Sequence, residues 1–153
     1  MNESESILVI RMLSQDYDTI DQLCGNLIAA IARIDQERLR DELADELNRL
    51  FAAEQTVIYK AIAQAGYATQ LCEPMLLQHE HLRQAVATLK SHSPDGLAFE
   101  NSVKSFRRLL VEYTAGVEQI VFPFIRTELT DQHDSLAIEL EAERQLEHGS
   151  FGV

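Results

Sequence analysis

The chain contains few helix-breaking residues and little positive charge. Its 153 residues include only 6 Gly and 3 Pro, which argues against a fold rich in turns or β-strands. Thirteen Lys and Arg residues stand against 25 Asp and Glu residues, giving a formal net charge of -12. Because an acidic surface repels phosphates, we expect neither nucleic acid nor an anionic membrane as a partner.

Cysteines and long apolar runs are also scarce. Cys24 and Cys72 are the only cysteines, too few and too far apart for a disulfide framework or a zinc knuckle. We expect buried thiols. No apolar stretch approaches the ~20 residues of a membrane span, and the first ten residues, MNESESILVI, lack the pattern of a signal peptide. The sequence therefore predicts a cytoplasmic protein.

What the chain does contain is apolar residues recurring every three or four positions, the period of amphipathic helices. This period predicts four long helices, at about residues 6–34, 37–65, 69–91 and 97–128, and a shorter fifth helix at 130–147. A break is expected near Asp35 and Gln36, a glycine cap at Gly66 and a kink at Pro123. Residues 148–153 are predicted to be a frayed tail.

Long helices joined by short links predict an all-α, antiparallel, up-down four-helix bundle with a fifth C-terminal helix, in a single domain at residues 1–147. The fifth helix has a narrow apolar stripe of Leu129, His133, Leu136 and Leu140. We expect this stripe to pack on its own bundle, which favours a monomer; a homodimer through the same face is the alternative.

Polar residues interrupt the apolar stripes of all four long helices. Glu54 lies in a stripe with Leu47 and Leu50, where a core leucine would be expected. The other stripes contain Tyr17, His79 and Tyr113, with Glu118 beside the last. A buried carboxylate must find a proton, a hydrogen-bond donor, a cation or a metal. The pattern therefore predicts a site in the middle of the bundle.

The order and spacing of these residues resemble the hemerythrin-like (HHE-type cation-binding) family. The resemblance rests on four short segments in chain order: Asp16-Tyr17-Asp18-Thr19-Ile20, Leu50 to Glu54, Met75 to His79, and Tyr113 to Glu118 followed by Val121-Phe122-Pro123. It covers about residues 8 to 145. It implies the bundle fold and two iron ions held by histidines and two bridging carboxylates.

By this resemblance Glu54 and Glu118 correspond to the bridging carboxylates and His79 to a terminal ligand. The other histidine positions of the family hold Tyr17, Leu50, Met75 and Tyr113. Leu50 and Met75 offer no hard ligand for iron, so these two mark lost ligand positions. A di-iron centre of the usual kind is not expected.

Two interpretations of the polar residues remain open. In one, each carboxylate accepts a hydrogen bond from Tyr17 or Tyr113, no metal binds, and one carboxyl is protonated. In the other, Glu54, Glu118 and His79 bind one or two iron ions, with Tyr17 and Tyr113 as phenolate ligands.

The first interpretation predicts no cofactor and a non-catalytic binding or regulatory module with a decayed di-iron centre, whose partner is an unidentified protein or small ligand. The second predicts a remodelled iron site in oxygen, redox or metal sensing. A third, weaker hypothesis is a small-ligand carrier that uses the emptied pocket.

Overall fold

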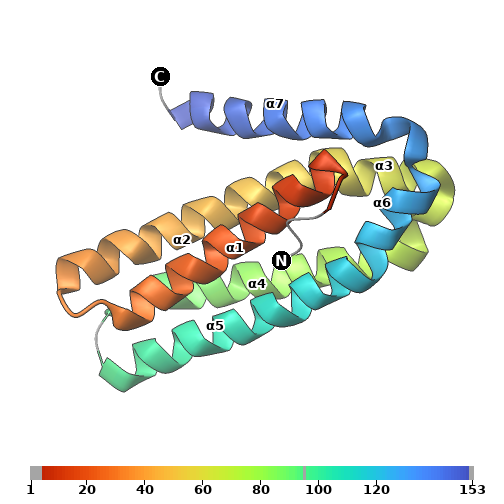
Figure 1. Ribbon diagram of the computed structural model, residues 1–153. Helices are drawn as coiled ribbons and strands as arrows, with labels where there is room; N and C mark the ends of the chain where they lie inside the picture. The colour runs from red at the N-terminus through yellow and green to blue at the C-terminus, as the bar shows by residue number, and fades with distance from the viewer. Residues whose placement is uncertain (1–4, 95, 152–153) are drawn as a thin grey trace.

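The computed structural model describes residues 5–94 and 96–151, with side chains up to residue 146, and these residues contain helices and no strand (Figure 1). The α-helices are α1 (Leu8–Ala29), α2 (Arg33–Ala53), α3 (Lys60–Ile62), α4 (Glu73–Ser91), α5 (Gly96–Gly116), α6 (Phe122–Glu128) and α7 (His133–Phe151). Shorter helical segments connect several of them. They are the π-helical segments Glu54–Tyr59, Ala63–Cys72 and Val117–Val121 and a 3-10 turn at Thr130–Gln132.

The π-helical segments keep two of the predicted helices continuous. Glu54–Tyr59 joins α2 to α3, and Val117–Val121 joins α5 to α6. The chain reverses at Gly66, where φ is 98°. A glycine without Cβ adopts this left-handed conformation at little cost, and the predicted cap at Gly66 is confirmed.

Four long helical units form the predicted antiparallel bundle. Each unit packs against two others: α1 lies against α2 and α5, and α4 lies against α2 and α5 (Figure 1). This ring of contacts is the one expected when short links force consecutive helices to run in opposite directions. The predicted fold class is confirmed.

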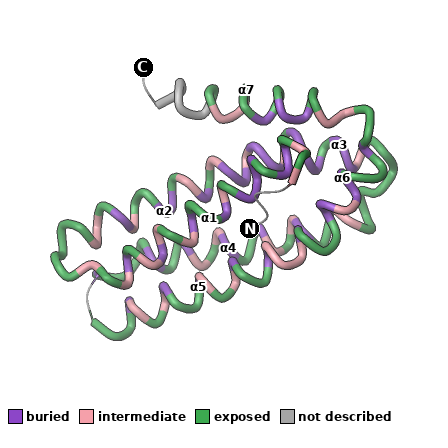
Figure 2. The backbone as a smooth tube through the Cα atoms, in the orientation of Figure 1, coloured by how far each residue is buried: buried purple, intermediate pink, exposed green. Residues whose placement is uncertain are grey.

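The predicted apolar stripes form most of the core. Figure 2 shows buried residues along the inward sides of the helices and exposed residues on the outward sides. Fully buried examples are Leu43, Leu47, Phe51 and Phe106, each at 0% exposure. Burial of one such side chain contributes roughly 1.5–3 kcal/mol, so the bundle has a substantial apolar core.

The end of the first helix was predicted wrongly. α1 ends at Ala29, and Ala30 and Ala32 are extended, with ψ of 136° and 134°. Consequently Ile31 and Ile34, which lie in the predicted helix 6–34 and continue the spacing of Cys24 and Leu27, are 94% and 77% exposed. Nothing in the local sequence forbids helix here; the break lets α2 turn back onto α1.

The end of the fourth helical unit also differs from the predicted stripe. Ile120 follows Tyr113 and Val117 at the spacing of an apolar stripe but is 50% exposed, whereas Val121 is buried. The π-helical segment at Val117–Val121 inserts an extra residue into the turn and shifts the buried face by one position. The predicted bend is present: Figure 1 shows the chain bending between α5 and α6, and Pro123 is the second residue of α6.

The fifth helix packs on the bundle to which it belongs. α7 contacts α1, α2 and the segment Glu54–Tyr59 and buries Leu136 and Leu140. Arg144 donates to the Met12 carbonyl at 3.0 Å and to the Asp16 carboxylate. The helix continues to Phe151, beyond its predicted end at Glu147. Of the predicted frayed tail, residues 152–153 lie outside the described residues.

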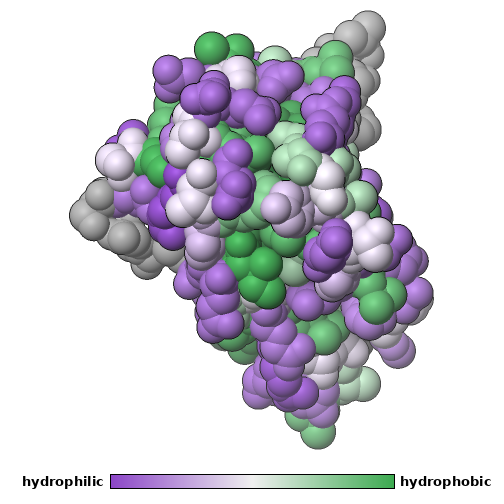
Figure 3. All heavy atoms as spheres, turned by 90° about the vertical axis from the view of Figure 1, so that its right-hand side faces the viewer, coloured by the Kyte–Doolittle hydropathy of each residue, from purple (hydrophilic) through white to green (hydrophobic). Residues whose placement is uncertain are grey.

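The surface of the described part of the chain is mixed in polarity. Within residues 5–94 and 96–151, no helix is long and apolar enough to cross a membrane. Figure 3 views the end of the bundle near α3 and α6, where hydrophobic side chains are interspersed with hydrophilic ones.

Removal of the fifth helix should therefore destabilise the protein. Truncation after Thr130 removes the buried side chains of Leu136 and Leu140, and burial of each such side chain contributes roughly 1.5–3 kcal/mol. We expect a lower urea midpoint and aggregation on gel filtration. A full-length dimer that becomes a stable monomer on truncation would instead show that α7 is a dimer interface.

Candidate site in the bundle core

Four of the five predicted site residues meet in the middle of the bundle. Tyr17 comes from α1, His79 from α4, Tyr113 from α5, and Glu54 stands where α2 passes into its π-helical extension. None of these side chains is more than 4% exposed. Their inward positions follow from the apolar stripes, in which each replaces a core residue.

The Glu54 carboxylate is the centre of the cluster. Tyr17 donates its hydroxyl to Glu54 Oε2 at 2.6 Å, and Tyr113 donates to Oε1 at 2.5 Å. His79 Nε2 lies 3.0 Å from the same Oε1. Both oxygens of a fully buried carboxylate thus have partners, which offsets the cost of removing it from water.

The Tyr113 hydroxyl is the second centre. It lies 2.7 Å from His79 Nε2 and 2.8 Å from the hydroxyl of Tyr59. Tyr59 comes from the π-helical segment after α2 and is 4% exposed. We call Tyr17, Glu54, Tyr59, His79 and Tyr113 the core network.

Gln55 and Phe51, at the edge of the core network, fix the orientation of His79. Arg83 can only donate hydrogen bonds, so the Gln55 amide turns its oxygen towards the Arg83 guanidinium, at 3.2 and 3.3 Å. In that orientation the same oxygen accepts from His79 Nδ1 at 3.1 Å. Phe51 stacks on the imidazole with ring centres 3.7 Å apart.

These contacts fix how many protons the core network holds. Glu54 Oε1, Tyr113 Oη and His79 Nε2 all lie within 3.0 Å of one another. These three atoms make three close contacts with one another. If they shared only one proton, at least one contact would bring two lone pairs face to face, so the three atoms hold two protons. We assign one to the Tyr113 hydroxyl and one to Nε2.

The three phenols of the core network are held in the neutral form. Burial raises the pKa of Tyr17, Tyr59 and Tyr113 well above the ordinary value, because phenolate is poorly solvated in the core. The negative charge of Glu54 raises each pKa further. Without a bound cation the tyrosines are therefore hydrogen-bond donors.

Glu118 does not join the core network, contrary to the prediction. It is exposed, and both Tyr17 and Tyr113 donate to Glu54 instead. In an α-helix a residue five positions after Tyr113 is turned roughly 140° away from it. The π-helical segment begins only at Val117, too late to bring Glu118 back to the core.

Tyr59, by contrast, was not among the predicted site residues and belongs to the core network. It also lies five positions after an inward residue, Glu54, but here the π-helical segment spans both. Because π-helical hydrogen bonds close every five residues, Glu54 and Tyr59 lie on one face. The sequence gives no clear signal for such a segment.

A family model, the hemerythrin HHE cation-binding domain, matches residues 8–125. The chain belongs to this family. No curated protein and no solved structure matches the chain. The match extends from the start of α1 almost to the end of α6 and so includes every member of the core network.

The side chains of this hemerythrin-like protein do not fit a di-iron centre. Within residues 5–94 and 96–146 no group of three or more His, Cys, Asp or Glu side chains is placed to hold a metal. Glu54 is the single carboxylate of the core network, so no second carboxylate bridges two ions. Leu50 and Met75 are buried, and Met75 packs towards Gly116.

Substitution of Glu54 should separate loss of charge from loss of the acceptor. Glu54→Gln keeps the size and one acceptor oxygen, so we expect a small loss of stability. Glu54→Ala leaves the Tyr17 and Tyr113 hydroxyls without their acceptor and should cost ~1–3 kcal/mol more. Urea unfolding of both variants measures the difference, and equal, negligible effects would contradict the described network.

Alkaline pH should destabilise the protein through the same phenols. Unfolded tyrosines lose their protons above about pH 10, whereas the raised pKa keeps the folded ones protonated. Stability from this source is full below about pH 10 and falls as pH rises, by up to ~1.4 kcal/mol per pH unit for each phenol. Urea unfolding against pH tests this; Tyr113→Phe should reduce the slope, and no decline would contradict it.

Proposed function

We propose that this hemerythrin-like protein is a non-catalytic binding or regulatory module in which hydrogen bonds replace the di-iron centre. One observation supports this most strongly: the buried Glu54 carboxylate accepts hydrogen bonds from Tyr17 and Tyr113 and contacts His79. A metal ion is not needed to satisfy these groups, and the apolar core is formed by other residues.

The proposal extends to the setting of the protein. We propose a cytoplasmic monomer, because α7 covers α1 and α2 rather than leaving its apolar side for a second copy. Its partner is a protein or a small ligand. The acidic composition, with a net charge of -12, disfavours nucleic acid and anionic membranes.

A remodelled iron site is the alternative function, and one observation favours it. The core network brings an imidazole, a carboxylate and three phenols together, and ferric ion accepts such nitrogen and oxygen donors. The raised pKa of each phenol disfavours phenolate in the free protein. A cation would have to displace the protons that the core network now holds.

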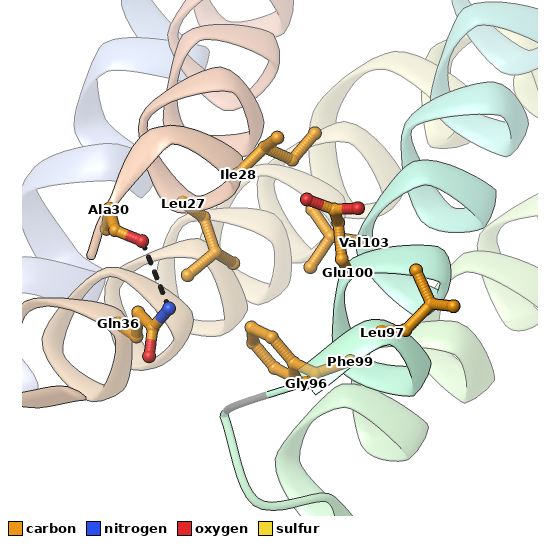
Figure 4. A pocket seen from close by; sticks show the side chains of 9 residues that line it. All are labelled: Leu27, Ile28, Ala30, Gln36, Gly96, Leu97, Phe99, Glu100 and Val103. Carbon is orange, nitrogen blue, oxygen red and sulfur yellow. Dashed lines mark hydrogen bonds between the residues drawn. The ribbon is translucent and has the colours of Figure 1, made fainter. Parts of the chain in front are cut away.

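The third hypothesis, a small-ligand carrier, would use a pocket other than the one predicted. The phenols of the core network occupy the region where an emptied metal pocket was expected. A pocket of about 320 Å³ lies elsewhere, between the end of α1 and the starts of α2 and α5. Figure 4 shows Leu27 and Phe99 facing this pocket, with Glu100 near its edge.

The metal content of the purified protein tests the proposed function directly. We expect less than about one iron per chain and no unfolding on treatment with a chelator, since the apolar core holds the bundle together. Elemental analysis and circular dichroism measure the two quantities. Two tightly held irons per chain, or unfolding on chelation, would overturn the proposal.

Titration with ferric ion distinguishes the alternative. Phenolate bound to Fe(III) gives a visible charge-transfer band, and Tyr17→Phe or Tyr113→Phe would remove it if these residues were ligands. We expect no visible band. Tyr67→Phe is the matched control, because Tyr67 packs against Phe124 outside the core network. A band that is lost in Tyr113→Phe and kept in Tyr67→Phe would support the remodelled iron site.

A further inference from the structure

Tyr113 combines complete burial with a proton acceptor at very short range. Its side chain is 0% exposed, and its hydroxyl donates to Glu54 Oε1 at 2.5 Å. Two further groups, Tyr59 Oη at 2.8 Å and His79 Nε2 at 2.7 Å, approach the same oxygen. The hydroxyl thus has one acceptor and two donors around it.

This arrangement matters for electron transfer. A phenol that loses one electron becomes a strong acid, so oxidation is favourable only if the proton can leave at the same time. In a buried site water cannot take the proton. A carboxylate already hydrogen-bonded to the phenol can take it with little movement of atoms.

We propose that Tyr113 is a redox-active tyrosine that gives up one electron to a one-electron oxidant and its proton to Glu54. The O–H bond of Tyr113 breaks, the proton binds to Glu54 Oε1, and the electron passes to the oxidant, which is reduced by one electron. The products are a neutral tyrosyl radical and a neutral carboxylic acid. Return of one electron and the same proton restores the starting state.

The surroundings of Tyr113 would stabilise this radical. The phenoxyl oxygen keeps hydrogen bonds from Tyr59 and from His79 Nε2–H. The rings of Phe51 and Tyr17 stand edge-on to Tyr113, with centres 5.6 and 6.0 Å away. Because the Tyr113 side chain is 0% exposed, the surrounding core separates the radical from reactants in water. Electrons need to cross only about one helix thickness, ~10 Å, to reach the surface.

Composition makes the proposal easy to test. The chain has 4 Tyr and no Trp, and three of the tyrosines belong to the core network. The fourth, Tyr67, is 39% exposed. Tyr67 is therefore a control within the same chain for oxidation of a tyrosine in contact with water.

The experiment uses the full chain and hexachloroiridate(IV), an outer-sphere one-electron oxidant, with freeze-quench electron paramagnetic resonance as the readout. We expect a tyrosyl radical that persists in the native protein and in Tyr67→Phe. In Tyr113→Phe we expect the persistent signal to be lost, because the residue that carries the radical is absent. A persistent signal lost in Tyr67→Phe and kept in Tyr113→Phe would overturn the proposal.

A second readout does not depend on whether Tyr113→Phe folds. Because the proton stays inside the protein, the midpoint potential measured by voltammetry should not change across the neutral pH range. A potential that falls by ~59 mV per pH unit, the one-electron value of a tenfold change in proton concentration, would show release of the proton to water and overturn the proposal.

Glu54→Gln tests the role of Glu54 as the proton acceptor. This variant keeps the size of the side chain and an acceptor oxygen but cannot take up the proton as a carboxylate does. We expect the persistent radical to be lost while circular dichroism stays unchanged. An unchanged radical in Glu54→Gln would overturn the assigned acceptor.

The inference rests on the proposed function in one respect, since it takes the core network to be free of metal. The two can fail separately. Two bound irons per chain would overturn the proposed function. A metal-free protein that gives no Tyr113 radical would overturn this inference alone.

Discussion

The bundle is organised around one desolvated carboxylate. Glu54 is 1% exposed, and a charge in this position is tolerated only if donors surround it. Three other helices supply those donors through Tyr17, His79 and Tyr113. Displacement of any of these helices would leave a buried polar group without its partner. The core network therefore fixes the relative positions of α1, α2, α4 and α5.

The π-helical segments decide which residues belong to the core network. The segment Glu54–Tyr59 turns Glu54 and Tyr59 to the same side of the helix, and Tyr59 then reaches the Tyr113 hydroxyl. The segment Val117–Val121 begins too late to do the same for Glu118, which remains exposed. The position of a one-residue insertion in a helical turn therefore decides whether the site contains one carboxylate or two.

Membership of the hemerythrin HHE family indicates cation binding, whereas the chemistry of this core does not. The match over residues 8–125 establishes a cation-binding family, whereas the described side chains supply one carboxylate and one imidazole together with phenols. A neutral imidazole has one N–H donor and one nitrogen lone pair that can bind a metal, whereas the Tyr17 and Tyr113 hydroxyls donate their protons to Glu54. A bundle that replaces histidines by tyrosines can therefore satisfy its remaining carboxylate by hydrogen bonds, and the same fold can be kept with a different interior.

The sequence by itself determined the helices, the bundle and the buried positions of Tyr17, Glu54, His79 and Tyr113, because a period of 3.6 residues places each of them among leucines and valines. It could not determine that α1 ends at Ala29, since no glycine or proline marks that turn. Only the tertiary structure decided that Tyr59 points inward, that Glu118 points outward and that both phenols share Glu54. These outcomes depend on local helix register and on contacts between residues from 37 to 59 positions apart. Apolar periodicity records which face of a helix is buried, but it does not record where that face shifts by one residue.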